Sequence, residues 1–135
     1  MDYKASELPS VAALSFLGDA VHGLYVRRML VGRGLGRSGE LNEAARALVS
    51  AEGQAEQAAR VLPHLYEREH DVYRRAYNSG HLNRPRHASG ADYRAATGLE
   101  AVLGMLAYEE KAARIEELMR LAIPQEQKET EIERS

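Results

Sequence analysis

LSFLGDAVHGLYV, residues 14–26, is the stretch that decides how this chain is interpreted. It is almost wholly apolar and helical in period, yet it contains one carboxylate, Asp19, directly after Gly18. An ionised side chain in such a run costs several kcal/mol if it is buried without a partner. The stretch therefore predicts a buried helix and raises the question of what the Asp19 carboxylate does.

Two apolar stripes run along this expected helix, on roughly opposite sides. The first is formed by Leu14, Leu17, Val21 and Leu24. The second, which contains Asp19, is formed by Ala12, Phe16, Gly23, Val26 and Leu30. Because a helix that is apolar on both sides is buried on both sides, it is either the central helix of a bundle or a helix that packs against a second copy across a two-fold axis.

The size and composition of the chain limit the possible classes of protein. Its 135 residues, 44% of them hydrophobic, suit one globular domain, and the formal net charge of −2 favours neither a polyanion-coating protein nor an acidic disordered one. The absence of cysteine excludes disulfides, a thiolate nucleophile and cysteine-ligated zinc. A polar N-terminus and the lack of a long apolar run predict a soluble cytoplasmic domain.

The rest of the sequence also has a helical period. We expect a first helix from a Ser10 cap to about Val31 and a glycine-rich turn over 32–39. Further helices are expected to begin at Ser38, at Ser50, at Pro63, at Ala91 and at Glu110. The apolar stripe of the helix after Pro63 is expected to consist of Leu65, Tyr66, Val72, Tyr73 and Ala76. The prediction is an all-α compact helical bundle over residues 1–123, with a loop over 78–90 and a polar, flexible tail over 124–135.

Basic residues gather in one part of the chain. Between Val72 and Leu99 a single acid, Asp92, stands against two histidines and five arginines: His81, His87, Arg74, Arg75, Arg84, Arg86 and Arg94. Such a stretch in a mildly acidic protein is either a localised anion site or a solvated face, and composition does not distinguish the two.

A second acid lies in a setting like that of Asp19. In YRAATGLEAVLG, residues 93–104, Gly98 and Gly104 flank Glu100, as Gly18 and Gly23 flank Asp19. Glycine inside a helix costs roughly 1 kcal/mol relative to alanine, so these pairs indicate close helix approach. If the two helices pack together, the carboxylates converge and repel unless a divalent cation lies between them, which is a setting that suits magnesium. The alternative is that each acid pairs with an arginine on the surface.

Together these motifs resemble the ribonuclease III family. FLGDAV and the later GLEAVLG resemble its signature helix E-x-x-E-F-L-G-D-A-V and its later D-x-x-E-A helix, in the same order. GELNEAARALVSAEGQA, RRAYNSG and YRAATGLEAVLG point more closely to the short bacterial branch, the Mini-ribonuclease III type, which lacks a double-stranded-RNA-binding domain. The resemblance covers about residues 11 to 123.

The resemblance implies an activity and a set of roles. The activity is magnesium-dependent hydrolysis of phosphodiester bonds in double-stranded RNA by an endoribonuclease, as in maturation of the large-subunit (23S) ribosomal RNA precursor. Asp19 and Glu100 match the catalytic acids that bind Mg²⁺, with Mn²⁺ as a substitute. Phe16 matches an aromatic residue that inserts into the partner of a symmetric homodimer. A ribosomal protein is a candidate partner.

The sequence also departs from the family pattern. Ala12 and Ser15 occupy the places of the two signature glutamates, and Thr97 replaces the late aspartate. His22 and Gly23 stand where the short branch often has Tyr and Glu. These departures leave fewer metal ligands than the full-length relatives have.

Duplex RNA is recognised mainly through its phosphates and 2′-hydroxyls, so a basic loop suits the expected substrate. The expected RNA-binding residues are Arg74, Arg75, Asn78, Arg84, Arg86 and Arg94. Two other classes of function remain open. One is a non-catalytic RNA-binding or ribosome-assembly protein of the same fold, and the other is a dimeric helical interaction module in which Asp19 forms an interfacial ion pair. Glu100 discriminates among them, because only a metal nuclease requires it to be a carboxylate.

Overall fold

The computed structural model describes residues 7–79 and 90–125, and these residues form helices without any strand. The helices are α1 (Val11–Gly32), α2 (Ser38–Val49), α3 (Ala51–Val61), the 3₁₀ helix η1 (Leu62–His64), α4 (Glu67–Tyr77), α5 (Gly90–Tyr108) and α6 (Ala112–Ala122). The all-α prediction is confirmed. Among these described helices, none has the length and apolar character that crossing a bilayer requires.

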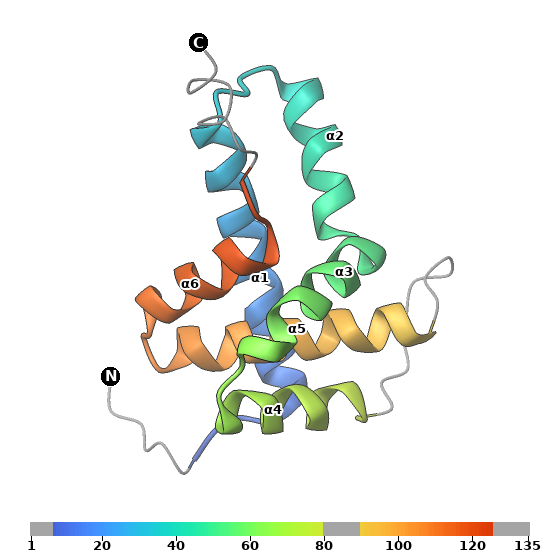
Figure 1. The fold of residues 1–135 in the computed structure, drawn as a ribbon, viewed down its shortest axis with the longest axis vertical. Coiled ribbons are helices and arrows are strands. Elements are labelled where there is room, and N and C mark those ends of the chain that lie inside the picture. The colour runs from blue at the N-terminus through green and yellow to red at the C-terminus, as the bar shows by residue number, and fades with distance from the viewer. Residues whose placement is uncertain (1–6, 80–89, 126–135) are drawn as a thin grey trace.

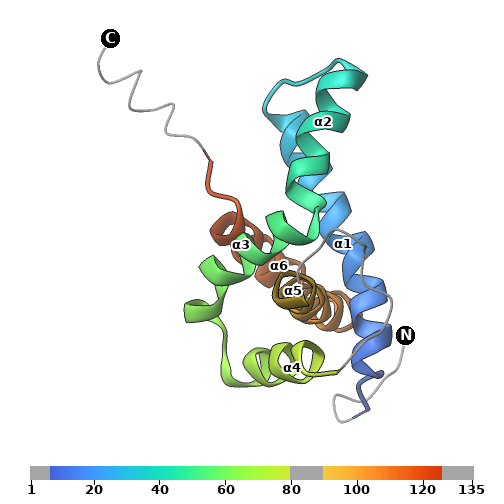
Figure 2. The same cartoon turned by 90° about the vertical axis from the view of Figure 1, so that its right-hand side faces the viewer.

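Helix α5 is the centre of the bundle. From Ala96 to Leu106 every residue except Glu100 is buried, which is the pattern of a helix surrounded on all sides. Helices α1, α3, α4 and α6 pack around it, as Figure 2 shows in a view close to the α5 axis. The C-terminal part of α1 and its neighbour α2 project beyond the other helices (Figure 1).

Helices α1 and α5 cross with their backbones in direct contact. A Cβ atom on Gly18 would lie 1.6 Å from the carbonyl oxygen of Glu100, and one on Gly104 would lie 1.9 Å from that of Leu14. No side chain fits in either place. The close approach predicted from the glycines is therefore confirmed for Gly18 and Gly104. Gly98 instead packs against the ring of Tyr73 on α4.

The inner face of α1 differs from both predicted stripes. Its buried residues recur at every fourth position and are Leu14, Gly18, His22, Val26 and Leu30. This single line combines members of both stripes, because the glycine crossing places α1 on α5 along Gly18. The opposite side of α1 carries three exposed apolar side chains, Phe16 (83% exposed), Leu24 (55%) and Val31 (62%).

Most predicted helix ends are confirmed. The Ser10 and Ser50 side chains accept the backbone N–H of Ala13 and Gly53, at 3.1 and 3.0 Å, as N-caps of α1 and α3. Gly34 has a φ of 93°, a left-handed conformation that suits the turn after α1.

The helix predicted to begin at Pro63 does not begin there. Pro63 belongs to η1, and α4 starts at Glu67. The predicted position of Tyr66 in an apolar stripe is consequently wrong: its side chain is 61% exposed, and its ring lies under the Arg114 guanidinium at 3.9 Å.

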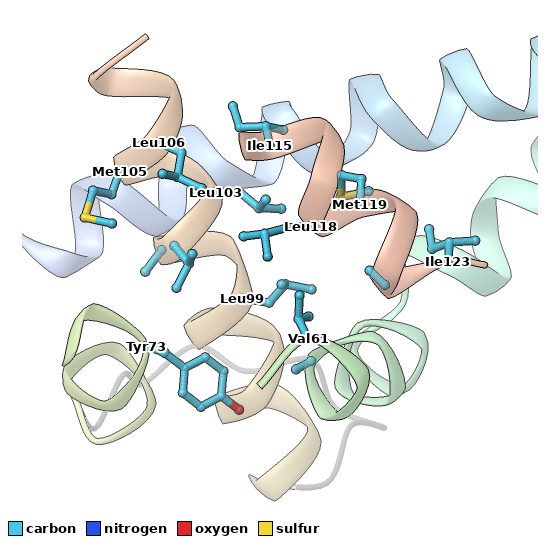
Figure 3. Packing of buried hydrophobic residues seen from close by; sticks show 14 of the residues in the cluster. Val61, Tyr73, Leu99, Leu103, Met105, Leu106, Ile115, Leu118, Met119 and Ile123 are labelled. Atoms are coloured by element: carbon cyan, nitrogen blue, oxygen red, sulfur yellow. The ribbon is translucent and has the colours of Figure 1, made fainter. Parts of the chain in front are cut away.

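The core lies where α3, α4 and α6 meet α5 (Figure 3). Leu103 and Leu118 are fully buried between α5 and α6, and Val61 adds the edge of α3. Tyr73 closes the α4 side. The backbone of α5 is thereby held on three sides while its fourth side contacts α1.

Candidate active site

The crossing of α1 and α5 brings Asp19 and Glu100 together. Both line one pocket of about 360 Å³, and their carboxyl groups are close enough to share a hydrogen bond. Because the backbones touch at Gly18 and at Glu100 itself, the acid that follows Gly18 on α1 and the Glu100 side chain leave the crossing side by side. The predicted convergence of the two acids is confirmed as geometry.

Burial affects the two acids differently. Asp19 is exposed, whereas Glu100 is largely covered. Burial, opposed by a hydrogen bond from Gln54 and assisted by the Asp19 charge, raises the pKa of Glu100 to about 8. The carboxylate that is costly to bury is therefore Glu100 rather than Asp19.

Neither acid has a cationic partner in the described residues. No lysine or arginine of 7–79 and 90–125 forms a salt bridge with Asp19 or Glu100, and their surroundings raise rather than lower the Glu100 pKa. These ranges also contain no cluster of three or more His, Asp or Glu residues suited to a metal. Two adjacent carboxylates without a counter-charge fit a hard divalent cation whose remaining ligands are waters and substrate oxygens.

Small and hydroxyl side chains occupy the positions where the resemblance to ribonuclease III led us to expect further acids. Ala12, Ser15 and Thr97 all line the pocket of Asp19 and Glu100. The Ser15 hydroxyl donates to the Thr97 carbonyl at 3.0 Å, and the Thr97 hydroxyl donates to the Tyr93 carbonyl at 2.8 Å. Ser15 therefore links α1 to α5, a structural task that a carboxylate without a proton could not perform.

Two glutamines of α3 that the sequence did not single out are buried nearby, and one of them, Gln54, contacts Glu100. Gln54 donates to Glu100 Oε2 at 3.1 Å, and Gln57 Oε1 lies 2.6 Å from His22 Nε2. His22 is fully buried, which lowers its pKa. The available signal was spacing, since Gln54, Gln57, Ala58 and Val61 repeat at one face of a helix.

The exposed side of α1 adjoins the acids. Phe16 lines the pocket of Asp19 and Glu100, and a neighbouring pocket of about 410 Å³ is lined by Asp19, Leu24 and Arg27, among others. An exposed apolar surface of this kind is typical of an interaction site. Of the predicted second stripe, Phe16 is exposed, whereas Val26 and Leu30 are buried in the core. The exposed apolar surface of α1 therefore combines Phe16 with Leu24, which was predicted for the other stripe.

The predicted RNA-binding residues fall into three groups. Arg74 and Arg75 lie exposed on α4, where both pair with Asp71, at 2.6 and 3.5 Å. Asn78 is exposed at the end of α4, and Arg94 is exposed on the first half of α5. Arg84 and Arg86 lie outside the described residues.

Comparisons with known proteins identify the family of this chain. The model of the Ribonuclease III domain matches residues 12–111. The chain is 38% identical to a Mini-ribonuclease 3 of Streptococcus pneumoniae over 79% of this chain and 85% of that protein. It is 36% identical to the Mini-ribonuclease 3 of Brevibacillus brevis, over 85% and 86% of the two chains.

A solved structure agrees as well. The crystal structure of a protein from Fusobacterium nucleatum has a TM-score of 0.81 and 28% identity, and the match covers 91% of this chain and all of that one. The family model and these relatives show that this chain belongs to the ribonuclease III family and is an endoribonuclease.

Proposed function

We propose that this endoribonuclease cleaves double-stranded RNA with Mg²⁺ held by Asp19 and Glu100. The observation that carries the proposal is the meeting of two carboxylates in one pocket without a cationic partner among the described residues. A divalent cation would offset their repulsion and would favour the ionised form of Glu100.

The roles of the side chains follow from their positions. Asp19, exposed at the pocket, and Glu100, largely buried, would each contribute a carboxylate oxygen. The chemistry that magnesium would supply here is polarisation of a phosphate, activation of a water at neutral pH and stabilisation of the leaving oxygen. The Ser15–Thr97 hydrogen bond and the Gly18–Gly104 crossing keep the two acids in register. A protein nucleophile is not needed for this hydrolysis.

We propose in addition that the active form is a homodimer built on the exposed side of α1. Phe16, at 83% exposure, would be buried by a second copy. Truncation of a buried Phe costs about 3–5 kcal/mol, so Phe16→Ala is expected to weaken the dimer strongly. Sedimentation at micromolar concentration tests this: a monomeric wild type, or a variant that dimerises equally well, would contradict the proposed interface.

The proposed RNA contacts are Arg74, Arg75, Asn78 and Arg94, together with Arg84 and Arg86 from the segment beyond α4. Helices α4 and α5 pack together. Arg74 and Arg75 lie on α4, and Arg94 lies on α5, the helix that also carries Glu100. These positions support a role for the three arginines near the acid pair. The proposed natural substrate is the precursor of 23S ribosomal RNA, with a ribosomal protein as partner. This assignment rests on the family resemblance.

The deciding experiment uses one long RNA duplex and one of its single strands, with and without Mg²⁺. We expect the wild type to cleave only the duplex and only with the metal. Asp19→Asn should lower cleavage by orders of magnitude and leave duplex binding intact. Glu43→Gln removes one exposed carboxylate from α2 and serves as the matched control. Near wild-type cleavage by Asp19→Asn at saturating duplex would overturn the metal assignment.

A further inference from the structure

Gln54 of α3 is buried against the acid pair. Its side chain is 3% exposed, and its amide nitrogen lies 3.1 Å from two acceptors, the Val49 carbonyl and Glu100 Oε2. Its own oxygen is buried and has no hydrogen-bond partner among the described residues. Both amide hydrogens are thus used, and they join the end of α2 to Glu100.

The orientation of this amide is set by Val49. A backbone carbonyl can only accept a hydrogen bond, so the nitrogen of Gln54 must point toward it. The second N–H is then directed at Glu100 Oε2, since a flipped amide would lose the Val49 bond and bring two oxygens together there. Gln54 therefore presents a fixed donor to one oxygen of Glu100, from a helix that is not part of the α1–α5 crossing.

Gln57, one helical turn later, provides an internal comparison. It is also buried, and it is also anchored on α2, because its amide nitrogen donates to the Leu48 carbonyl at 2.8 Å. Its oxygen, however, contacts His22 at 2.6 Å and not an acid. The two glutamines share burial and anchoring and differ in the group that they contact.

We propose that Gln54 is a positioning residue that fixes the Glu100 carboxylate for metal binding, by holding Oε2 from the α2–α3 corner. The inference rests on the proposed metal role of Glu100. A glutamate side chain has several rotatable bonds, and a fixed donor from a packed helix reduces the freedom of its carboxyl group. Partners of this kind around metal ligands commonly change metal affinity about 10- to 100-fold when they are removed.

The test compares Gln54→Met with Gln57→Met, which remove equivalent buried amides at nearly constant volume. Binding of Mn²⁺ to the RNA-free protein is measured by calorimetry, and thermal unfolding reports stability. We expect both variants to lose stability, whereas only Gln54→Met binds Mn²⁺ about 10- to 100-fold more weakly. The Mg²⁺ concentration for half-maximal cleavage should rise by a similar factor, with duplex affinity unchanged in the absence of metal.

Equal Mn²⁺ affinities for the two variants would overturn the proposal. If Gln54→Met does not fold, Gln54→Asn, which retains an amide but is too short to reach Glu100 from the same backbone, provides the same comparison. Glu100→Gln separates the two levels of inference. If Glu100→Gln binds Mn²⁺ as tightly as the wild type, both the metal role of Glu100 and the positioning role of Gln54 are refuted. If Glu100→Gln loses Mn²⁺ affinity but neither Gln54 variant does, only the positioning role is refuted.

Discussion

Two glutamates, Glu69 and Glu100, are both covered by the fold, and their surroundings are opposite. Glu69, on α4, is 3% exposed and receives two hydrogen bonds from Arg114, at 2.7 and 2.9 Å, and one from the Tyr66 backbone N–H at 2.9 Å. Glu100 receives one hydrogen bond from a neutral amide and faces a second carboxyl group.

The difference separates a carboxylate whose charge is paired within the fold from one that we propose binds a metal. Arg114 belongs to α6, so its pairing with Glu69 and its bond to the His64 carbonyl fasten α6 to η1 and α4. A buried carboxylate that is paired in this way does not require a bound ion to offset its charge. A buried carboxylate that is kept without a counter-charge is costly, and such sites are typically functional.

The largest expected effect is on cleavage. Glu69→Gln and Glu100→Gln each remove one negative charge with little change in shape. Because only Glu100 shares the pocket of Asp19, we expect Glu100→Gln to lower cleavage of duplex RNA by orders of magnitude. Glu69→Gln should remain within a few-fold of wild type under conditions where it is folded. Cleavage rates are measured at saturating duplex and Mg²⁺. Similar rates for the two variants would contradict a catalytic role that belongs to Glu100 and not to Glu69.

Stability should change in the opposite order. Loss of the Glu69 charge leaves Arg114 largely buried without its main partner, which we expect to lower the free energy of unfolding by about 2–3 kcal/mol. Folding of the metal-free protein at neutral pH requires Glu100 to take up a proton, because its pKa is raised to about 8. Glu100→Gln removes this cost and should raise the free energy of unfolding by about 1–3 kcal/mol. Denaturation in urea with EDTA measures both. The distinction fails if Glu100→Gln is the less stable variant.

The pH dependence of stability sharpens the comparison further. With its pKa raised to about 8, Glu100 keeps its proton in the folded state over a range where the unfolded chain has lost it. The metal-free protein should therefore lose stability as pH rises from about 4.5 to about 8, by at most about 1.4 kcal/mol per pH unit, and level off above that range. Glu100→Gln should lack this component. Parallel pH profiles for wild type and variant would contradict the unusual ionisation of Glu100.

The smallest expected effect concerns two arginines. We propose that they bind RNA phosphates, whereas Arg114 binds a carboxylate of the chain itself. Arg84→Ala combined with Arg86→Ala should weaken duplex binding about equally for all sequences, because phosphate contacts carry no direct sequence information. The slope of log affinity against log salt should fall by about 0.9 for each lost contact. Arg46→Ala combined with Arg120→Ala, at exposed positions of α2 and α6, is the charge-matched control. If the double variant at 84 and 86 has the duplex affinity and the salt dependence of the wild type, the RNA contacts lie elsewhere.

The sequence by itself determined the helical class and the meeting of the two acids. Both are consequences of local patterns: the period of apolar residues sets the helices, and Gly18 and Gly104 mark where two of them can touch. Once α1 and α5 cross at these glycines, Asp19 and Glu100 are adjacent whatever the rest of the chain does. The paired acids were for that reason predictable from two short stretches.

Only the tertiary structure decided which of the two acids is the less exposed, which face of α1 is outward and which side chain contacts Glu100. Gln54 is 46 positions away from Glu100, and Arg114 is 45 positions from Glu69. The start of α4 was predicted at Pro63 and lies at Glu67. There Glu69 accepts a hydrogen bond from the Tyr66 N–H and also binds Arg114. Such contacts depend on how separate helices pack against one another, and no local period or spacing encodes them.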